Sequence, residues 1–438
     1  MKIAMFTNTF TPHVGGVARS VQGLVDELRR LGHHVLVVAP EFENVAPDET
    51  DVLRIPAVQN FNGSDFSLPM PVLPIKVSHL LKDFQPDIVH SHHPFLLGET
   101  ALRIAVSCDA PVIFTHHTRY EQYTHYLPGD SDLLKHFVID LVNGYCNLCN
   151  AVVAPSRSIA DMLLKQGVLS PIEVIPTGVD PLYFAEPEDG AWRHRLGIPE
   201  DAIVVGHVGR LAAEKNLPFL CQAVCRFLLG NPAAHFLLIG EGSAREEMVA
   251  EFHRQGLQQR LHLQGILDRR SLTSAYHCMD VFAFASQSET QGLVLAEAMA
   301  AGTPVVAVDA PGVRDIVVDT HNGRLLSLEV IDSFVEALCW VARLSAERRM
   351  QLRQNALQSA EQLSVVNCVG KMLELYYERI RAESALPQIA ESRWQKARKR
   401  ISREFEILKN YGHAIEDTIH WLPLIKADEK PAETKKDL

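Results

Sequence analysis

The sequence predicts an α/β protein of two successive domains, each with a parallel sheet, followed by a helical C-terminal extension. Apolar, β-branched runs alternate with helical patterns in two series. Residues 179–200, which are rich in proline and charge, separate the two series and read as a linker. From about residue 330 onward the pattern is helical. The length of 438 residues suits two to three domains.

The expected strands are short apolar runs bounded by turn residues. The first series comprises residues 2–6, 34–40, 87–92, 111–117, 151–156 and 172–178. The second series comprises residues 202–210, 235–242, 260–265, 280–286 and 304–310. Ligands of such sheets bind beyond the carboxyl ends of the strands, so two successive sheets imply a cleft between the domains.

The expected domain boundaries follow this pattern. Residues 1–178 form the first Rossmann-like domain and residues 179–370 form the second. Residues 371–426 form C-terminal helices, the first of which crosses back to the N-terminal domain. Residues 427–438 form a disordered tail, because they are polar and charged.

Within the extension, residues 393–411 predict a basic amphipathic helix. Apolar residues recur at steps of three or four and form one stripe, namely Trp394, Ala397, Ile401, Phe405, Leu408 and Tyr411. The segment contains only two acidic residues, Glu404 and Glu406. It contains seven basic residues, namely Arg393, Lys396, Arg398, Lys399, Arg400, Arg403 and Lys409. Such a helix suits an anionic membrane surface. The alternative is a terminal helix that packs on the protein and leaves its basic residues solvated.

Composition excludes several classes of protein. A formal net charge of −11 argues against a nucleic-acid binder, and no apolar run reaches the length of a transmembrane helix. The N-terminus continues directly into a strand pattern and does not read as a cleaved signal. The eight cysteines are sparse and irregular, which indicates a reducing cytoplasm. We expect Cys146 and Cys149, like Cys221 and Cys225, to be buried as small apolar side chains.

Two segments have the composition of phosphate-binding sites. Gly15 and Gly16 follow the first strand and lead into a helix, where backbone amides can approach a phosphate. Their alternative is a plain turn. Arg210 and Lys215 lie at the end of the first strand of the second series, and two cations there suit a diphosphate. Their alternative is two solvated surface charges.

Histidines and aspartates raise the question of a metal site. Asp130 and Asp132 form an isolated DxD that precedes an apolar helix, so helix capping is favoured over metal binding. Five histidines lie at the ends of two of the expected strands, but no helical H-x-x-x-H or accompanying carboxylate set is present. We expect some of them to line the cleft rather than bind metal: His90, His92, His93, His116 and His117.

Two glutamates in SETQGLVLAE (288–297) stand eight residues apart. A continuous helix would separate Glu289 from Glu297 by about 12 Å, whereas a glycosidase pair needs roughly 5–9.5 Å. We expect Glu289 in a loop and a helix that begins near Gly292, so that the amides of Gly292, Leu293 and Val294 face an anion. The two carboxylates would then bind the ends of an elongated ligand such as a sugar nucleotide. The alternative is an acidic helix start with an incidental second glutamate.

These motifs together resemble the retaining GT-B glycosyltransferases of family 4 over about residues 1–380. Glu289 and Glu297 match the E-x7-E motif of that family, in which the first glutamate binds donor-sugar hydroxyls and the second binds the ribose. Arg210 and Lys215 match its G-R-x4-K element, which holds the donor diphosphate. The resemblance implies the GT-B fold, with two Rossmann-like domains that face a cleft.

Other positions match more locally. Gly16 matches the glycine loop near the phosphates, His117 the histidine beside the donor sugar, and the backbone around Ile266 the region that contacts the base. In this resemblance the catalytic residues are His117, Glu289, Arg210 and Lys215. The chain departs from the family at 311–317, where Asp315 stands in place of the glutamate of G-G-x-x-E.

Within the family, THHTRYEQYTHY (115–126) is most similar to bacterial α-monoglucosyldiacylglycerol synthases. That likeness implies transfer of glucose from UDP-glucose to diacylglycerol, without a metal or cofactor, at the inner face of the cytoplasmic membrane. A soluble acceptor is the alternative within transferases. A phosphorylase or epimerase on the same frame is a second rival, and a nucleotide-sugar-binding protein without turnover is a third.

Overall fold

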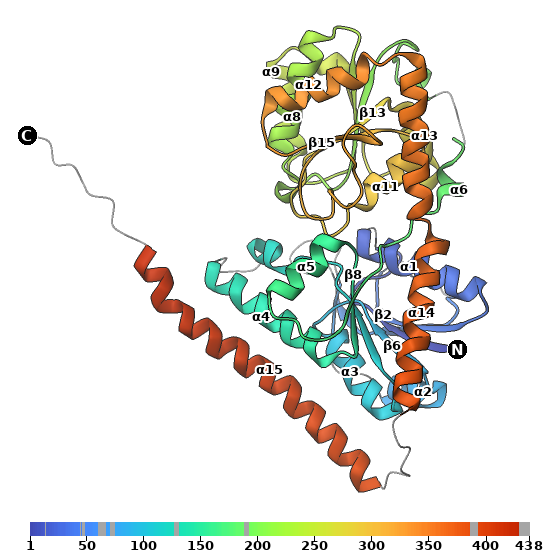
Figure 1. Cartoon of the computed structure of the whole chain (residues 1–438), viewed down its shortest axis with the longest axis vertical. Helices are drawn as coiled ribbons and strands as arrows, with labels where there is room; N and C mark the ends of the chain where they lie inside the picture. The colour runs from blue at the N-terminus through green and yellow to red at the C-terminus, as the bar shows by residue number, and fades with distance from the viewer. Residues whose placement is uncertain are drawn as a thin grey trace, which may run out of the picture.

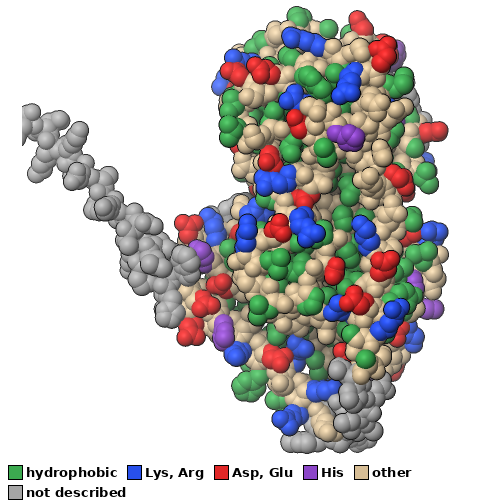
Figure 2. Space-filling view, in the orientation of Figure 1, with side chains coloured by type: hydrophobic (Ala, Val, Ile, Leu, Met, Phe, Trp, Pro, Cys, Tyr) green, Lys and Arg blue, Asp and Glu red, His purple; other side chains and the backbone are tan. Residues whose placement is uncertain are grey.

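The computed structural model describes residues 1–13, 15–43, 45, 49–59, 67–70, 75–126, 131–187, 192–385 and 393–428. Asp130 and most of the expected tail, residues 429–438, lie outside this set. Two parallel sheets lie in separate domains along the long axis of the molecule (Figure 1). On the face drawn in Figure 2, acidic and basic side chains are mixed over both domains.

The first sheet has seven strands in the order β3-β2-β1-β6-β7-β8-β9. Its strands are β1 (Lys2–Phe6), β2 (His34–Pro40), β3 (Val52–Ile55), β6 (Ile88–Ser91), β7 (Val112–Thr115), β8 (Ala151–Ala154) and β9 (Ile172–Val174). A small antiparallel pair consists of β4 (Ala57–Val58) and β5 (Leu68–Pro69). The helices of this half are α1 (Gly16–Arg30), α2 (Ile75–Phe84), α3 (Leu97–Cys108), the 3-10 helix η2 (Tyr120–Tyr126), α4 (Asp132–Leu148) and α5 (Arg157–Lys165).

The second sheet has six strands in the order β12-β11-β10-β13-β14-β15. They are β10 (Val204–Val208), β11 (His235–Ile239), β12 (Leu261–Gln264), β13 (Val281–Phe284), β14 (Val305–Val308) and β15 (Gly323–Leu326). Its helices are α6 (Pro181–Phe184), α7 (Trp192–Arg195), η3 (Ala213–Lys215), α8 (Leu217–Gly230), α9 (Arg245–Arg254), η4 (Gln258–Arg260), α10 (Arg269–Cys278), α11 (Leu293–Ala300), α12 (Ile331–Ala342) and α13 (Ala346–Gln362).

Each sheet carries a buried apolar cluster on both faces, as expected for parallel strands covered by helices. Cys146 and Cys149 belong to the core of the first domain, and Cys221 and Cys225 to the core of the second. None of the four forms a disulfide, which confirms that they serve as small buried side chains.

The chain crosses between the domains twice at one place. Val179 N donates to Leu363 O at 2.9 Å, and Val365 N donates to Val179 O at 2.7 Å. Helix α14 (Val365–Ser384) then returns to the N-terminal domain, where Tyr376 is fully buried in the core beside α1. The first crossing leads from β9 of the first sheet toward β10 of the second, and the second crossing leads from α13 into α14.

The last helix, α15 (Arg393–Asp428), runs alongside α4 and α3 on the N-terminal domain (Figure 1). Of the helices in the described residues, none is both long and apolar enough to span a bilayer.

Gly178 is predicted to be essential to the crossing. A Cβ atom at this position would lie 2.2 Å from Val365 Cα, so Gly178→Ala forces the two segments apart and should lower the free energy of unfolding by about 1–3 kcal/mol. Gly370→Ala is the matched control, because no atom lies within 4 Å of a Cβ there and alanine favours the interior of α14 by up to about 1 kcal/mol. Urea unfolding of the two variants measures these changes. A Gly178→Ala protein as stable as the parent would contradict the role of Gly178 in the close approach of the two segments.

Candidate active site

The segment from Glu289 to Glu297 begins after β13 and has the predicted form. Glu289 lies in the loop, and α11 begins at Leu293 after Gly292. Gly292 has φ +83°, in the left-handed region that favours glycine, and this sharp turn orients the start of the helix. The amides of the first turn of α11 therefore provide the partial positive charge of a helix N-terminus next to Glu289.

Glu289 pairs with Lys215 beyond the carboxyl ends of the adjacent inner strands β13 and β10. The ammonium group of Lys215, at the end of η3, donates to a carboxylate oxygen of Glu289, and both side chains are less than one-fifth exposed. Burial raises the pKa of Glu289, but the charge and hydrogen bond of Lys215 outweigh this, so the pKa lies below its ordinary value. Glu289 is therefore held as a carboxylate, able to accept hydrogen bonds from hydroxyl groups.

Arg210 also has an acidic partner, which sequence reasoning missed. Its guanidinium group forms an ion pair with Glu214, whose side chain is only 5% exposed. The sequence does contain an indication of this ion pair, because Glu214 lies four residues after Arg210 and directly before Lys215. Lys215 is thus largely withdrawn from solvent, whereas Arg210 is half exposed, and the binding of a diphosphate by the two cations stays a prediction.

Glu297 is buried on α11 and has partners from both domains. Arg19 Nη1 donates to its Oε1 at 3.1 Å, and the Tyr276 hydroxyl donates to its Oε2 at 2.9 Å. Arg19 lies on α1, three residues after Gly16. Glu297 is 4% exposed, so it is not a solvated surface charge, and its role in binding a ligand stays a prediction. Neither Arg19 nor Tyr276 was expected from the sequence.

The residues between the two glutamates attach to the N-terminal domain. The hydroxyl of Thr290 donates to His117 O at 2.8 Å. The amide side chain of Gln291 accepts from Thr177 N at 2.6 Å and donates to Thr177 O at 2.8 Å. Ser156 Oγ donates to Thr290 O at 2.7 Å. One loop of the C-terminal domain is thus hydrogen-bonded to the ends of β7, β8 and β9.

Asp315 makes a further contact between the domains. Its carboxylate accepts from Ser158 N at 3.2 Å and from Ser158 Oγ at 2.6 Å. It also accepts from Gly312 N at 3.2 Å. Asp315 therefore joins α5 to the turn after β14.

The cleft histidines form a buried cluster. His92 Nδ1 and His117 Nε2 are 3.0 Å apart, and both residues line a pocket with Thr115 and Thr177. His90 bonds to the Tyr376 hydroxyl at 2.6 Å and to Thr115 Oγ1 at 2.8 Å. Within the described ranges, no three histidine, cysteine, aspartate or glutamate side chains are grouped as metal ligands.

The remaining predicted positions lie at the start of α1, after β12 and at the start of α4. Gly15 caps α1 and Gly16 is its first residue. Ile266 follows β12 with its side chain 67% exposed. In the DxD segment, the residue that caps α4 is Ser131, whose Oγ accepts from Leu134 N at 3.2 Å, and Asp132 is the first residue of the helix.

Burial of neutral histidines predicts loss of stability in mild acid. Burial lowers the pKa of His90 and His93 to about 3 and of His116 and His207 to about 4, and those of His92 and His117 also lie well below 6.5. These groups bind protons near pH 6.5 only in the unfolded chain. The free energy of unfolding should therefore fall as pH decreases below about 6.5, by up to about 1.4 kcal/mol per pH unit for each histidine.

Urea unfolding between pH 7.5 and 5 checks this, since that window lies above the carboxylate range. His207→Gln should flatten the slope, whereas the exposed His253→Gln should leave it unchanged. A flat profile for the parent protein would contradict the prediction.

Two family models and several known proteins match the chain. Residues 14–182 match Glycosyltransferase Family 4, and residues 188–359 match Glycosyl transferases group 1. The alpha-monoglucosyldiacylglycerol synthase of Streptococcus pneumoniae is 30% identical over 331 residues, which cover 74% of this chain and 75% of that protein. A GDP-mannose-dependent alpha-mannosyltransferase of Mycolicibacterium smegmatis is 30% identical over 356 residues, which cover 80% of this chain and 90% of that protein.

Among solved structures, HepE from Anabaena in complex with UDP-glucose aligns with a TM-score of 0.68 at 20% identity. The alignment covers 86% of this chain and all of that one, and it confirms the fold predicted from the motifs. With two paired glutamates at the cleft, two parallel-sheet domains and these relatives, the chain is a glycosyltransferase with the GT-B fold and belongs to glycosyltransferase family 4.

Proposed function

We propose that this protein transfers glucose from UDP-glucose, with retention of configuration, to a hydroxyl group of diacylglycerol or another membrane lipid. The observation that carries the proposal is the pair of carboxylates on either side of the α11 N-terminus, partly buried Glu289 and buried Glu297, each paired with one cation. A sugar nucleotide has hydroxyls at both ends and phosphates between them, and this order of groups is complementary to Glu289, the α11 amides and Glu297.

In the proposed reaction, the departing diphosphate is stabilised by fixed positive charge. Arg210, Lys215 and the amides of Gly292, Leu293 and Val294 surround its site, and they act by electrostatic preorganisation. No metal ion or cofactor takes part, because these groups neutralise the leaving group. The phosphates also approach the glycine turn at Gly16.

The sugar and the nucleoside are positioned by the two glutamates. Glu289 exchanges Lys215 for sugar hydroxyls, and Glu297 exchanges Arg19 for the ribose. His117 contacts the sugar as a neutral imidazole, since its pKa lies well below 6.5. The exposed segment at Ile266 receives the base.

The choice of sugar and acceptor rests on the relatives. The synthases of Streptococcus pneumoniae and Acholeplasma laidlawii are named for glucosyl transfer to diacylglycerol, and the segment THHTRYEQYTHY (115–126) resembles the same group. We accordingly place the protein in the cytoplasm, as a peripheral protein at the inner face of the cytoplasmic membrane. GDP-mannose-dependent mannosyl transfer is the second candidate, favoured by relatives of similar identity.

Product analysis should separate these candidates. The protein, incubated with a panel of nucleotide sugars and either lipid extract or soluble metabolites, is expected to form a glucosylated lipid only with UDP-glucose, detected by mass spectrometry. A mannosylated product from GDP-mannose would favour the second candidate. Failure to release nucleotide with any mixture would favour a non-catalytic binding protein.

Glu289→Ala should reduce transfer by at least about 100-fold, because the sugar loses its anchor, while UDP affinity stays largely unchanged. Initial rates and calorimetric UDP titration measure the two quantities. A thermal melt controls for folding, since the substitution leaves Lys215 unpaired in a buried position. Near-normal transfer would refute the assigned role.

A further inference from the structure

Helix α15 is fixed to the N-terminal domain by one of its faces, its inner face. Ile407 and Ala414 are buried there, 4% and 1% exposed. Asn410 Nδ2 donates to Leu141 O at 3.0 Å, and Arg403 Nη1 donates to Leu148 O at 3.2 Å, both on α4. Gly144 permits this approach, because a Cβ there would lie 1.5 Å from Asn410 Oδ1.

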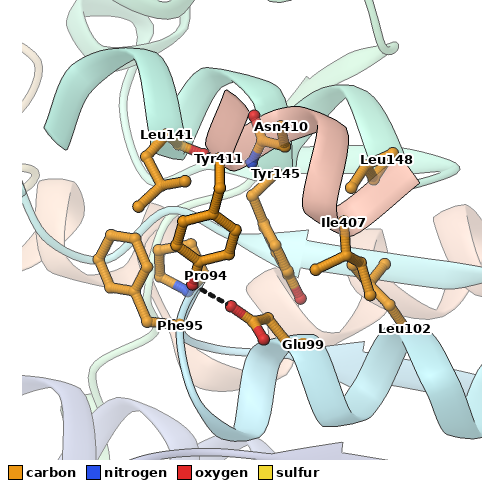
Figure 3. Close-up of a pocket in the computed structure, with 10 residues that line it drawn as sticks. All are labelled: Pro94, Phe95, Glu99, Leu102, Leu141, Tyr145, Leu148, Ile407, Asn410 and Tyr411. Atoms are coloured by element: carbon orange, nitrogen blue, oxygen red, sulfur yellow. Dashed lines mark hydrogen bonds between the residues drawn. The ribbon is translucent and has the colours of Figure 1, made fainter. Parts of the chain in front are cut away.

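The same face is also tied to α3. Figure 3 shows the hydroxyl of Tyr411 pointing to Glu99, to which it donates a hydrogen bond, and Ile407 lying near Leu102. Arg103 Nε donates to Glu404 Oε1 at 2.7 Å. These contacts set the rotation of α15 about its axis.

The contacts leave a second apolar row in solvent. This outer row consists of Ile401, Phe405, Leu408 and Ile415, which are 58%, 71%, 65% and 52% exposed. The steps of four, three and seven residues place the side chains along one side of the helix, over about 21 Å. Because the inner face is held on α3 and α4, the row cannot turn inward.

The charge around the outer row identifies its partner. Residues 393–417, which span the row, contain seven basic residues and four acidic ones, Glu404, Glu406, Glu416 and Asp417, although the whole chain carries −11. Exposed Arg398 and Lys409 lie three and four residues from Ile401 and Phe405, so they stand beside the row. Two copies meeting through this row would bring these like charges together, whereas an anionic bilayer attracts them.

We propose that the outer row of α15 docks this protein on an anionic lipid bilayer, with the row in the headgroup–acyl boundary and the flanking basic residues on lipid phosphates. This inference rests on the proposed function, because docking on a bilayer would bring the enzyme to its lipid acceptor. Docking holds α3 and α4 toward the membrane, and α3 begins four residues after His93 at the cleft.

The test is flotation of the full chain with vesicles of phosphatidylglycerol and phosphatidylcholine, compared with phosphatidylcholine alone. Phe405→Glu/Leu408→Glu should lower partitioning to anionic vesicles at least 10-fold with an unchanged melting temperature, because both side chains are already exposed. Ser402→Glu/His413→Glu adds two acidic groups at exposed positions of the same helix outside the row and should bind much more strongly than the first variant.

Three results would overturn the proposal. They are absence of vesicle binding by the parent chain, equal binding by the parent and Phe405→Glu/Leu408→Glu, and a parent dimer that this double substitution converts to a monomer in sedimentation equilibrium.

The proposed function is tested separately by UDP-glucose binding and by transfer to detergent-dispersed diacylglycerol, both of which Phe405→Glu/Leu408→Glu should retain. If the parent chain binds vesicles but glucosylates no lipid, the docking proposal is supported and the proposed function is refuted.

Discussion

The burial of Glu289 and Glu297 is the constraint on which the rest of the cleft depends. A carboxylate removed from water needs an opposite charge and hydrogen bonds, or it takes up a proton. Glu289 obtains Lys215 from its own domain, whereas Glu297 obtains Tyr276 from its own domain and Arg19 from the other. Both acids are therefore paired within the protein, and a ligand that takes over either of them must offer it an equivalent partner.

This requirement shapes the proposed exchange of partners. Sugar and ribose hydroxyls are weaker partners for a carboxylate than a cation, so they would not displace Lys215 and Arg19 by themselves. A diphosphate between them changes the balance, because it attracts the cations that the acids release. A ligand with hydroxyls at both ends and phosphates in the middle satisfies all groups at once, and a ligand that lacks any of these parts leaves a buried charge unpaired.

Much of the fold was predictable because parallel strands in a buried sheet are continuous apolar runs. The runs at 111–117 and 172–178 extended beyond the real strands, which end at Thr115 and Val174, since the following residues turn toward the cleft. Strands β3 and β15 were missed because their short sequences are half-exposed edge segments.

The site was predictable only where its pattern is local along the chain. The loop-to-helix form of residues 289–297 follows from one stretch of sequence, but the pairing of Glu297 with Arg19 joins residues 278 positions apart. In α15, the sequence pattern assigned Tyr411 to the same stripe as Phe405, whereas Tyr411 packs against Glu99 and Phe405 faces solvent. A helix with two apolar sides has a periodicity that does not show which side is buried.

The loop that carries the two glutamates also joins the two domains. Gln291 bonds to both backbone groups of Thr177, which adjoins the Gly178 crossing, and Thr290 bonds to His117 O. Each of these hydrogen bonds contributes about 0.5–1.5 kcal/mol. Breaking them to separate the domains at the cleft therefore costs only a few kcal/mol, which is small enough for the separation to be reversible. The contact of Arg19 with Glu297 belongs to the same set, and a ligand that takes over Glu297 must bridge the domains in its place. In the proposed exchange of partners, the link between the domains that Arg19 makes through Glu297 passes to the ligand, so ligand binding and the relative position of the domains depend on the same carboxylate.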